Sequence, residues 1–227
     1  MKENTMIDVE NVSKIFNEGT PQAFEALKSI DLKVEKGETM ILSGVSGSGK
    51  STLLSLIAAL DKPSSGKIIV EEELISKLPD LHASAYRANR IGFIFQHFNL
   101  LESLSVEENV IAPLINSGFD IKTIRKMAVK SMQSAAISHK ATQQVNELSG
   151  GEKQRCAIAR ALVHEPELII CDEPTANLDR ANSLKFIEIL QALHDRGKTI
   201  IVATHDPLFE TLPFVSKIVH MEDGSIV

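Results

Sequence analysis

Cysteine and long apolar runs are both scarce in this sequence. Only two cysteines, Cys156 and Cys171, occur in 227 residues. Both lie inside apolar or helical patterns without metal-ligand spacing, so we expect small buried hydrophobic side chains. The longest apolar stretches, such as residues 53–60, are far shorter than the ~20 residues that a membrane-spanning helix needs. The sequence therefore predicts no disulfide, no zinc site and no membrane span.

Positive charge is also in deficit. The chain has 24 Lys and Arg against 30 Asp and Glu, a formal net charge of -6. Nucleic-acid binding depends on clustered basic residues that neutralise phosphates, so we expect no nucleic-acid partner. Residues 1–10 are polar and acidic and lack the basic-then-apolar order of a secretory signal. We therefore expect a cytoplasmic protein.

Apolar runs bounded by turn residues predict buried strands at 39–42, 91–95, 167–171 and 199–203. Near-continuous apolar runs are typical of parallel strands that are covered on both faces. Helical patterns lie between them, over 50–60 and over 181–196, where Gly197 is placed to end the helix. Strands alternating with helices predict an α/β fold with a mostly parallel sheet and right-handed crossovers.

Two further regions depart from this alternation. Residues 7–34 contain alternating segments that we interpret as antiparallel strands flanking the main sheet, although such short segments are ambiguous. Between about 99 and 164 the strand signal vanishes, and Ser105 and Glu108 have the spacing of a capping box. We expect one domain over 1–227 with a helical subdomain inserted at about 99–164.

Residues 44–51, Gly-Val-Ser-Gly-Ser-Gly-Lys-Ser, fit the phosphate-loop pattern between an apolar strand and a helix. Glycines allow backbone N–H groups to point at phosphate oxygens, and the following helix N-terminus adds positive potential. We expect Lys50 to neutralise the β- and γ-phosphates and Ser51 to bind Mg²⁺. A chance glycine-rich turn is the alternative, which the strand–loop–helix context disfavours. The candidate nucleotide-binding residues here are Gly44, Ser46, Gly47, Ser48, Gly49, Lys50, Ser51 and Thr52.

Two carboxylates follow the apolar run that ends at Cys171. Asp172 and Glu173 fall at the carboxyl end of a predicted strand, where ligands of such sheets bind. Asp172 is the candidate partner of Mg²⁺, directly or through water, and Glu173 the candidate general base for an attacking water. An isolated acidic pair would more simply cap the next segment, but the phosphate loop upstream favours the catalytic interpretation.

A second anion-binding pattern occurs at residues 148–155, Leu-Ser-Gly-Gly-Glu-Lys-Gln-Arg. Ser149, Gly150 and Gly151 begin a predicted helix and would present backbone N–H groups to an anion. Two such sites in one small domain are explained if two chains meet head to tail. Each Ser149 loop would then cover the γ-phosphate that the other chain's phosphate loop holds.

In this combination and order, the motifs resemble the ABC ATPase family over essentially the whole chain. The match also includes Gln96 after the predicted strand 91–95, residues 174–179 (Pro-Thr-Ala-Asn-Leu-Asp), and His205. The resemblance implies that ATP and Mg²⁺ are bound by a homodimer. It implies that Gln96 links Mg²⁺ or the attacking water to a transport subunit, that Asp179 crosses the dimer interface, and that His205 contacts the γ-phosphate.

Each of these residues also has a simpler interpretation. Gln96 could be a surface amide and His205 a capping residue. Phe16 lies where the family places an aromatic ring that stacks on adenine, but it could belong to the core, and Phe24 could serve instead.

The segment 91–101 looks like the branch of this family that powers lipoprotein release and macrolide export. This implies integral membrane permease subunits as partners and a location on the inner face of the membrane. Phe98, Leu100 and Leu101 would form part of a groove for those subunits, or else subdomain core. Val145 replaces a proline common before the Ser149 motif. Cell-division members of the branch that signal without transport are the alternative. A soluble ATPase of DNA repair or translation is disfavoured, because it would need a coiled coil, zinc ligands or tandem domains.

Overall fold

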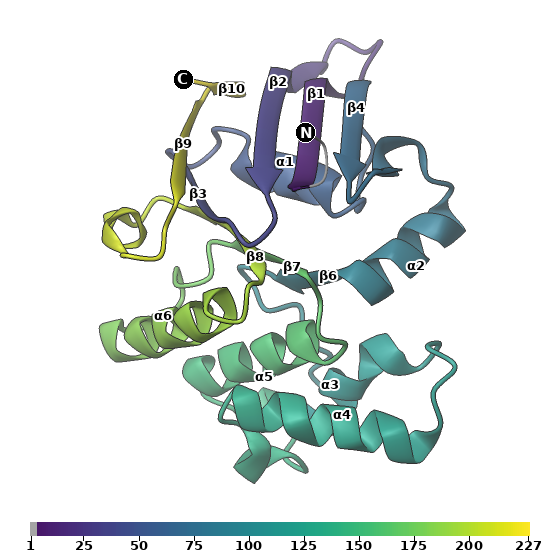
Figure 1. Ribbon diagram of the computed structural model, residues 1–227, viewed down its shortest axis with the longest axis vertical. Helices are drawn as coiled ribbons and strands as arrows, with labels where there is room; N and C mark the ends of the chain where they lie inside the picture. Colours follow the sequence, from purple (N-terminus) through teal and green to yellow (C-terminus); the bar gives the residue numbers. More distant parts are fainter. Residues whose placement is uncertain (1–3) are drawn as a thin grey trace.

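The computed structural model describes residues 4–227, which form two β-sheets with helices between and around them (Figure 1). The larger sheet has the strand order β10-β9-β3-β8-β7-β6, and its pairs from β9 to β6 are parallel. The expected α/β fold with a mostly parallel sheet is therefore confirmed. Its strands are β3 (Thr39–Ser43), β6 (Ile91–Ile94), β7 (Leu168–Asp172), β8 (Thr199–Thr204), β9 (Lys217–Glu222) and β10 (Ser225–Ile226).

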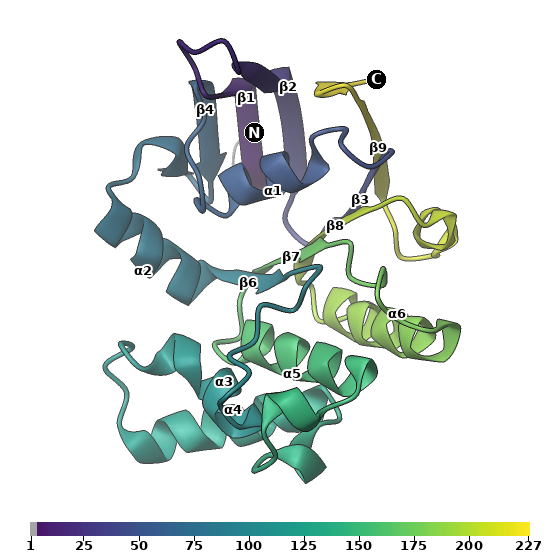
Figure 2. The same ribbon diagram turned by 180° about the vertical axis from the view of Figure 1, so that it is seen from behind.

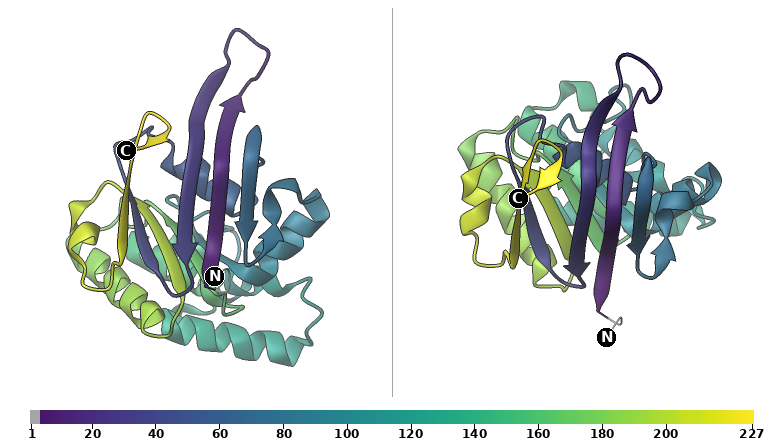
Figure 3. Two further views of the ribbon diagram at one scale, coloured as in Figure 1. Left: turned by 45° about the horizontal axis from the view of Figure 1, so that its top comes forward. Right: turned by 90° about the horizontal axis from the view of Figure 1, so that it is seen from above.

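The smaller sheet is antiparallel and has the order β2-β1-β4-β5. It contains the antiparallel pair expected within residues 7–34. The β1–β2 hairpin is long, and its tip extends beyond the rest of the chain in Figure 3. The strands of this sheet are β1 (Thr5–Phe16), β2 (Phe24–Glu35), β4 (Ser65–Val70) and β5 (Glu73–Leu74).

Residues of the parallel strands alternate between two hydrophobic clusters. Met40 and Leu42 of β3 belong to one cluster, whereas Ile41 belongs to the other. The same period of two separates Ile170 from Ile169 on β7, because successive side chains of a strand point to opposite faces. Both faces of the sheet are therefore buried, and this explains why its strands read as continuous apolar runs.

Helices fill the two sides unequally (Figure 2). Helix α1 packs between the two sheets, while α3, α4, α5 and α6 share the cluster on the opposite face of the parallel sheet. The helices are α1 (Lys50–Ile57), α2 (Asp80–Arg90), α3 (Val106–Ile111), α4 (Ile121–Ser134), α5 (Gly150–Leu162) and α6 (Arg180–His194). Residues 99–164 thus contain α3, α4 and α5, and α3 begins with the expected capping box of Ser105 and Glu108.

Several element boundaries differ from the sequence-based expectations. The helix expected over 50–60 ends at Ile57, because Ala59 adopts a left-handed conformation (φ 50°) and the Leu60 N–H bonds back to the Ser55 carbonyl. The expectations also omitted α2, β4, β5, β9 and β10. Of these, β9 alternates buried and exposed residues, as a half-buried strand does.

Candidate functional site

The phosphate loop, residues 44–51, passes closely between β2 and β9. Gly49 has a φ of +101°, and a Cβ atom there would lie 2.8 Å from the carbonyl oxygen of Ala26. A Cβ atom at Gly44 would lie 2.3 Å from the carbonyl oxygen of Met221. Glycine is therefore required at both positions, by the left-handed backbone at Gly49 and by the close approach at both.

The turn between β9 and β10 supports this loop from one side. The Gly224 N–H donates to the Ser48 carbonyl (3.1 Å), and the Gly224 carbonyl accepts from the Lys28 N–H (2.8 Å). The Ser48 hydroxyl is buried and has no hydrogen-bond partner among residues 4–227. A buried polar atom without a partner calls for one, and a phosphate oxygen in the loop would fit it. No local sequence pattern marks this support, because Lys28, Ser48 and Gly224 are distant from one another in the sequence.

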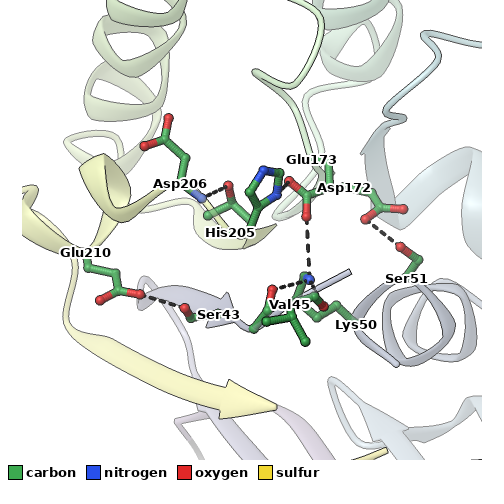
Figure 4. Close-up of polar contacts among 11 residues, drawn as sticks. Ser43, Val45, Lys50, Ser51, Asp172, Glu173, His205, Asp206 and Glu210 are labelled. Atoms are coloured by element: carbon green, nitrogen blue, oxygen red, sulfur yellow. Dashed lines mark hydrogen bonds and ion pairs between the residues drawn. The ribbon is translucent and has the colours of Figure 1, made fainter. Parts of the chain in front are cut away.

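Lys50 begins α1 and is almost fully buried. Its ammonium donates to the carbonyls of Gly44 (2.6 Å) and Val45 (3.0 Å) and lies 3.5 Å from Glu173 Oε1 (Figure 4). A buried cation needs such partners. The cation is thus held inside the loop, beside the helix N-terminus, where it can neutralise a phosphate.

The structure brings together Ser51 and Asp172, the two residues expected at Mg²⁺. Ser51 Oγ donates to Asp172 Oδ1 at 2.9 Å. Burial is the main cause that raises the pKa of Asp172, and the Glu173 carboxylate adds to it, while the Ser51 hydroxyl and Lys50 oppose it. A cation between these oxygens would stabilise the charged carboxylate.

The two oxygens fit Mg²⁺, which is commonly bound by one or two carboxylates together with substrate phosphates. Within the described part of the chain, no group of three or more His, Cys, Asp or Glu side chains could hold a metal ion. The protein alone thus supplies a partial ligand set, which phosphate oxygens would complete.

Glu173 and His205 are in direct contact at the ends of β7 and β8 (Figure 4). Glu173 Oε2 lies 2.9 Å from His205 Nδ1, and the Glu173 N–H donates to the Ala203 carbonyl at 2.9 Å. Glu173 also has a φ of 44°. Left-handed residues other than glycine are strained and cluster at functional sites. His205, which is exposed, thus orients the Glu173 carboxylate. A general base must be held in position within reach of the water that it deprotonates.

Ser43 and Glu210 add a contact that the sequence analysis missed. Ser43 Oγ donates to Glu210 Oε1 at 2.6 Å. Ser43 ends β3 immediately before the phosphate loop, and Glu210 lies in the 3-10 turn η5 (Pro207–Thr211) that follows His205. The pair thus ties the two loops together, and its separation of 167 residues left no local signal.

The Ser149 loop caps α5. Ser149 Oγ accepts from the Glu152 N–H (3.4 Å), and the Glu152 carboxylate accepts from the Ser149 N–H (2.9 Å). This backbone hydrogen bond is the main cause that lowers the pKa of Glu152 to about 2. A Cβ atom at Gly151 would lie 2.7 Å from Asn182 Oδ1, whereas one at Gly150 would meet nothing closer than 3.7 Å.

A single chain does not bring the Ser149 loop to the phosphate loop. Helix α1, which follows the phosphate loop, and α5, which follows Ser149, pack against opposite faces of the parallel sheet. Instead, Gly150 and Gly151 lie beside Asn177 and Asn182.

Gln96 and Asp179 have contacts within the chain that differ from their expected roles. The Gln96 carbonyl accepts from Asn177 Nδ2 at 2.9 Å, so this contact is made by the main chain of Gln96. Asp179 caps α6, where its Oδ1 accepts from the Asn182 N–H at 2.8 Å. This bond is the main cause that lowers the pKa of Asp179. Roles at Mg²⁺ and across a dimer stay predictions.

Phe16 and Phe24 face each other across the β1–β2 ladder. Their exposed fractions are 39% and 60%, so neither is a core residue. Lys14 Nζ lies 5.0 Å from the centroid of the Phe16 ring. Ala26, two residues after Phe24, lies beside Gly49 of the phosphate loop. The exposed pair of Phe16 and Phe24 is therefore at the end of β2 that is near this loop.

The remaining sequence candidates have less distinctive surroundings. Ser46 is exposed, and Thr52 is half-buried in the first turn of α1. Of the three apolar residues considered for a partner groove, Leu101 is exposed (52%). Phe98 is half-buried, and the half-buried Leu100 packs against the hydrophobic cluster that α3, α4, α5 and α6 share. Cys156 and Cys171 are free and buried, as expected.

Over residues 4–227, none of the helices combines the length and the apolar character that a bilayer span requires. The ABC transporter family model matches residues 27–176. The macrolide export ATP-binding/permease protein MacB of Campylobacter jejuni is 40% identical over 98% of this chain, which spans 34% of that protein. The lipoprotein-releasing system ATP-binding protein LolD of Pseudoalteromonas translucida is 37% identical over 97% of this chain and 94% of its own.

A solved structure agrees with these relatives. The ATP-binding cassette MJ0796, determined as a dimer in a post-hydrolysis state with ADP and phosphate, matches with a TM-score of 0.89. It is 37% identical, and the match covers 97% of this chain and 96% of that one. Together with the phosphate loop, the Ser149 motif and the paired carboxylates, these likenesses show that the chain is an ATPase that belongs to the ABC transporter family.

Proposed function

We propose that this chain hydrolyses ATP at a composite site between two copies of itself, and that closure of this dimer drives integral membrane permease subunits. The observation that carries the proposal is the meeting of Lys50, Glu173 and His205 at the carboxyl ends of β3, β7 and β8. Ligands of open parallel sheets bind at this edge.

The residues of one chain divide the chemistry among them. Lys50 and the N–H groups of the phosphate loop bind the triphosphate, and Ser51 with Asp172 would hold Mg²⁺. When bound, Mg²⁺ would neutralise charge on the β- and γ-phosphates. Glu173 accepts the proton of an attacking water, and His205 keeps that carboxylate in place.

The second copy explains the position of the Ser149 loop. Its capped helix N-terminus offers Gly150 and Gly151 N–H groups to an anion, although its own phosphate loop lies across the sheet. A head-to-tail dimer would place each Ser149 loop over the γ-phosphate of the partner site, with Asp179 at the interface. The dimeric state of the similar cassette MJ0796 supports this arrangement.

Membrane subunits are the proposed partners, since the similar LolD and MacB are named for lipoprotein release and macrolide export. The chain would then act on the cytoplasmic face of the membrane, as one ATPase domain with a helical subdomain at about 99–164. Its tagged form, purified from membranes of its native host in mild detergent, should carry a permease subunit. Recovery of the chain from the soluble fraction alone would contradict the proposed partnership. If the co-purified subunit is instead of the cell-division type, the proposed function changes from transport to signalling across the membrane.

A further inference from the structure

Residues 96–99, the first part of the loop that follows β6, are held through three main-chain carbonyls. The guanidinium of Arg160, on α5, donates to the carbonyl of Phe98 (2.6 Å) and to the carbonyl of Asn99. Asn177, between β7 and α6, donates to the carbonyl of Gln96 (2.9 Å). The position of this loop therefore depends on donors from two other segments.

The loop has a conformation that needs such support. Phe98 (φ 61°) and Asn99 (φ 48°) are both left-handed. A bulky residue such as phenylalanine is strained there, and such strain persists only where the surroundings fix it. Arginine suits the task, because its planar fork of donors can reach two neighbouring carbonyls in a fixed geometry, whereas lysine offers one ammonium group on a flexible stem.

Arg160 and Asn177 both lie on segments that have a role in the proposed dimer. Arg160 lies on the helix that begins at the Ser149 loop, and burial lowers the pKa of its guanidinium. Asn177 lies between Glu173 and Asp179. Arg160 thus connects the helix that begins at the Ser149 loop to the loop that carries Gln96.

We propose that Arg160 is a positioning residue for ATP hydrolysis, which fixes the carbonyls of Phe98 and Asn99 and so sets where Gln96 lies relative to α5. The inference rests on the proposed role of Gln96 at Mg²⁺ or the attacking water. Arg160 acts through the loop and does not itself contact reacting atoms. Without the guanidinium the strained Phe98 relaxes, and Gln96 keeps only the anchor that Asn177 provides to its carbonyl.

A double-mutant cycle on the full chain tests this role. Arg160→Lys keeps the charge but cannot hold both carbonyls in the same way. We expect kcat to fall about 10-fold, as for residues that orient a metal ligand, and the half-saturating Mg²⁺ concentration to rise. The KM for ATP should stay near the wild-type value. In a Gln96→Ala background, Arg160→Lys should lower kcat no further, since both changes act through one residue.

Arg87→Lys is the matched control, because Arg87 on α2 also donates to a main-chain carbonyl, that of Ala59. It should retain wild-type kcat and Mg²⁺ dependence. If Arg160→Lys does not fold, Arg160→Gln, which removes the charge but retains an amide donor, takes its place in the cycle.

Two results would overturn the inference. One is an unchanged kcat and Mg²⁺ dependence in the Arg160 variant, and the other is a full additional loss in the Gln96→Ala background. Lys50→Ala separates this outcome from failure of the proposed function. If Lys50→Ala retains ATPase activity, the proposed ATP site is wrong. If it is inactive and the cycle is additive, only the role of Arg160 is wrong.

Discussion

Glu173 Oε2 lies 2.9 Å from Nδ1 of His205, although the two residues are 32 positions apart in the sequence. The parallel register of β7 and β8, which pairs Asp172 with Ala203, brings the two strand ends together. The other oxygen of the same carboxylate lies 3.5 Å from the ammonium of Lys50. One carboxylate thus joins the phosphate loop to the strand that ends before His205, so a change at either neighbour should reach the general base.

His205→Ala should lower kcat roughly 10- to 100-fold, because Glu173 loses the partner that orients it, which is less than the loss expected for a general base itself. In a Glu173→Gln background the same change should have little further effect, since the two residues act as a unit. Single-turnover ATP hydrolysis measures both. Equal losses in the two backgrounds would mean that His205 does not act through Glu173.

Lys50→Ala should lower ATPase activity by at least about 100-fold, because the triphosphate loses the buried cation that the phosphate loop holds. Lys62→Ala provides the control, since Lys62 is exposed and pairs with Asp80 on the surface. Steady-state phosphate release compares the two. Similar activity in both variants would refute the assignment of the phosphate loop.

Gly224→Ala should destabilise the protein more than Gly197→Ala. The two glycines have nearly the same φ, +78° and +76°, so both variants bear the left-handed cost of about 1–2 kcal/mol. A Cβ atom at Gly224 would in addition lie 2.7 Å from the Ala26 carbonyl, whereas nothing lies within 4 Å of one at Gly197. Urea unfolding should show the difference. The Gly224 variant should also bind ATP more weakly, because Gly224 supports Ser48. Equal stability and affinity in the two variants would contradict that support.

The contribution of Glu152 to stability should depend on pH. Its pKa is about 2 in the folded chain, below the ordinary value of 4.5. The carboxylate therefore contributes stability above pH 4.5, and this contribution is lost as the pH falls toward 2. Glu152→Gln should be less stable than wild type near pH 7, by at most about 1 kcal/mol because solvent still reaches this half-buried surface group. Urea unfolding should show the difference shrinking with acidification, and a constant difference would be contrary evidence.

Sequence patterns predicted the buried parallel strands well, but they missed strands with one exposed face, such as β4 and β9. β3, β7 and β8 are covered on both faces, so their apolar runs are continuous and easily recognised. β4 contains the exposed Lys67, and β9 contains the exposed His220, so their weaker alternation escaped notice. The early end of α1 depends on a left-handed alanine, a conformation for which the sequence carries no glycine or asparagine signal.

The site divides in the same way between local and long-range features. Lys50, Ser51, Asp172 and Glu173 lie in contiguous motifs, and the sequence order alone placed them at the same edge of the sheet. Glu210 and Gly224 act through contacts with residues 167 and 176 positions away, so no local pattern marks them. The Ser149 loop needs a second chain to complete its proposed role, and a single fold cannot supply that.

The composite site predicts that ATP holds two chains together when hydrolysis is blocked. Glu173→Gln keeps the size of the side chain but cannot accept a proton, so turnover should fall on the order of 10²- to 10⁴-fold. It also removes one negative charge per chain beside the triphosphates, which favours closure. Ser149→Arg in the same background places a bulky side chain where the Ser149 loop would meet the opposite γ-phosphate, and it should prevent closure.

Light scattering after size-exclusion chromatography, at saturating ATP and Mg²⁺, gives the most direct test. Glu173→Gln should elute as a dimer with ATP and as a monomer without it, and the double variant with Ser149→Arg should remain monomeric in both. A Glu173→Gln chain that stays monomeric with ATP, or a double variant that dimerises equally well, would contradict the composite site.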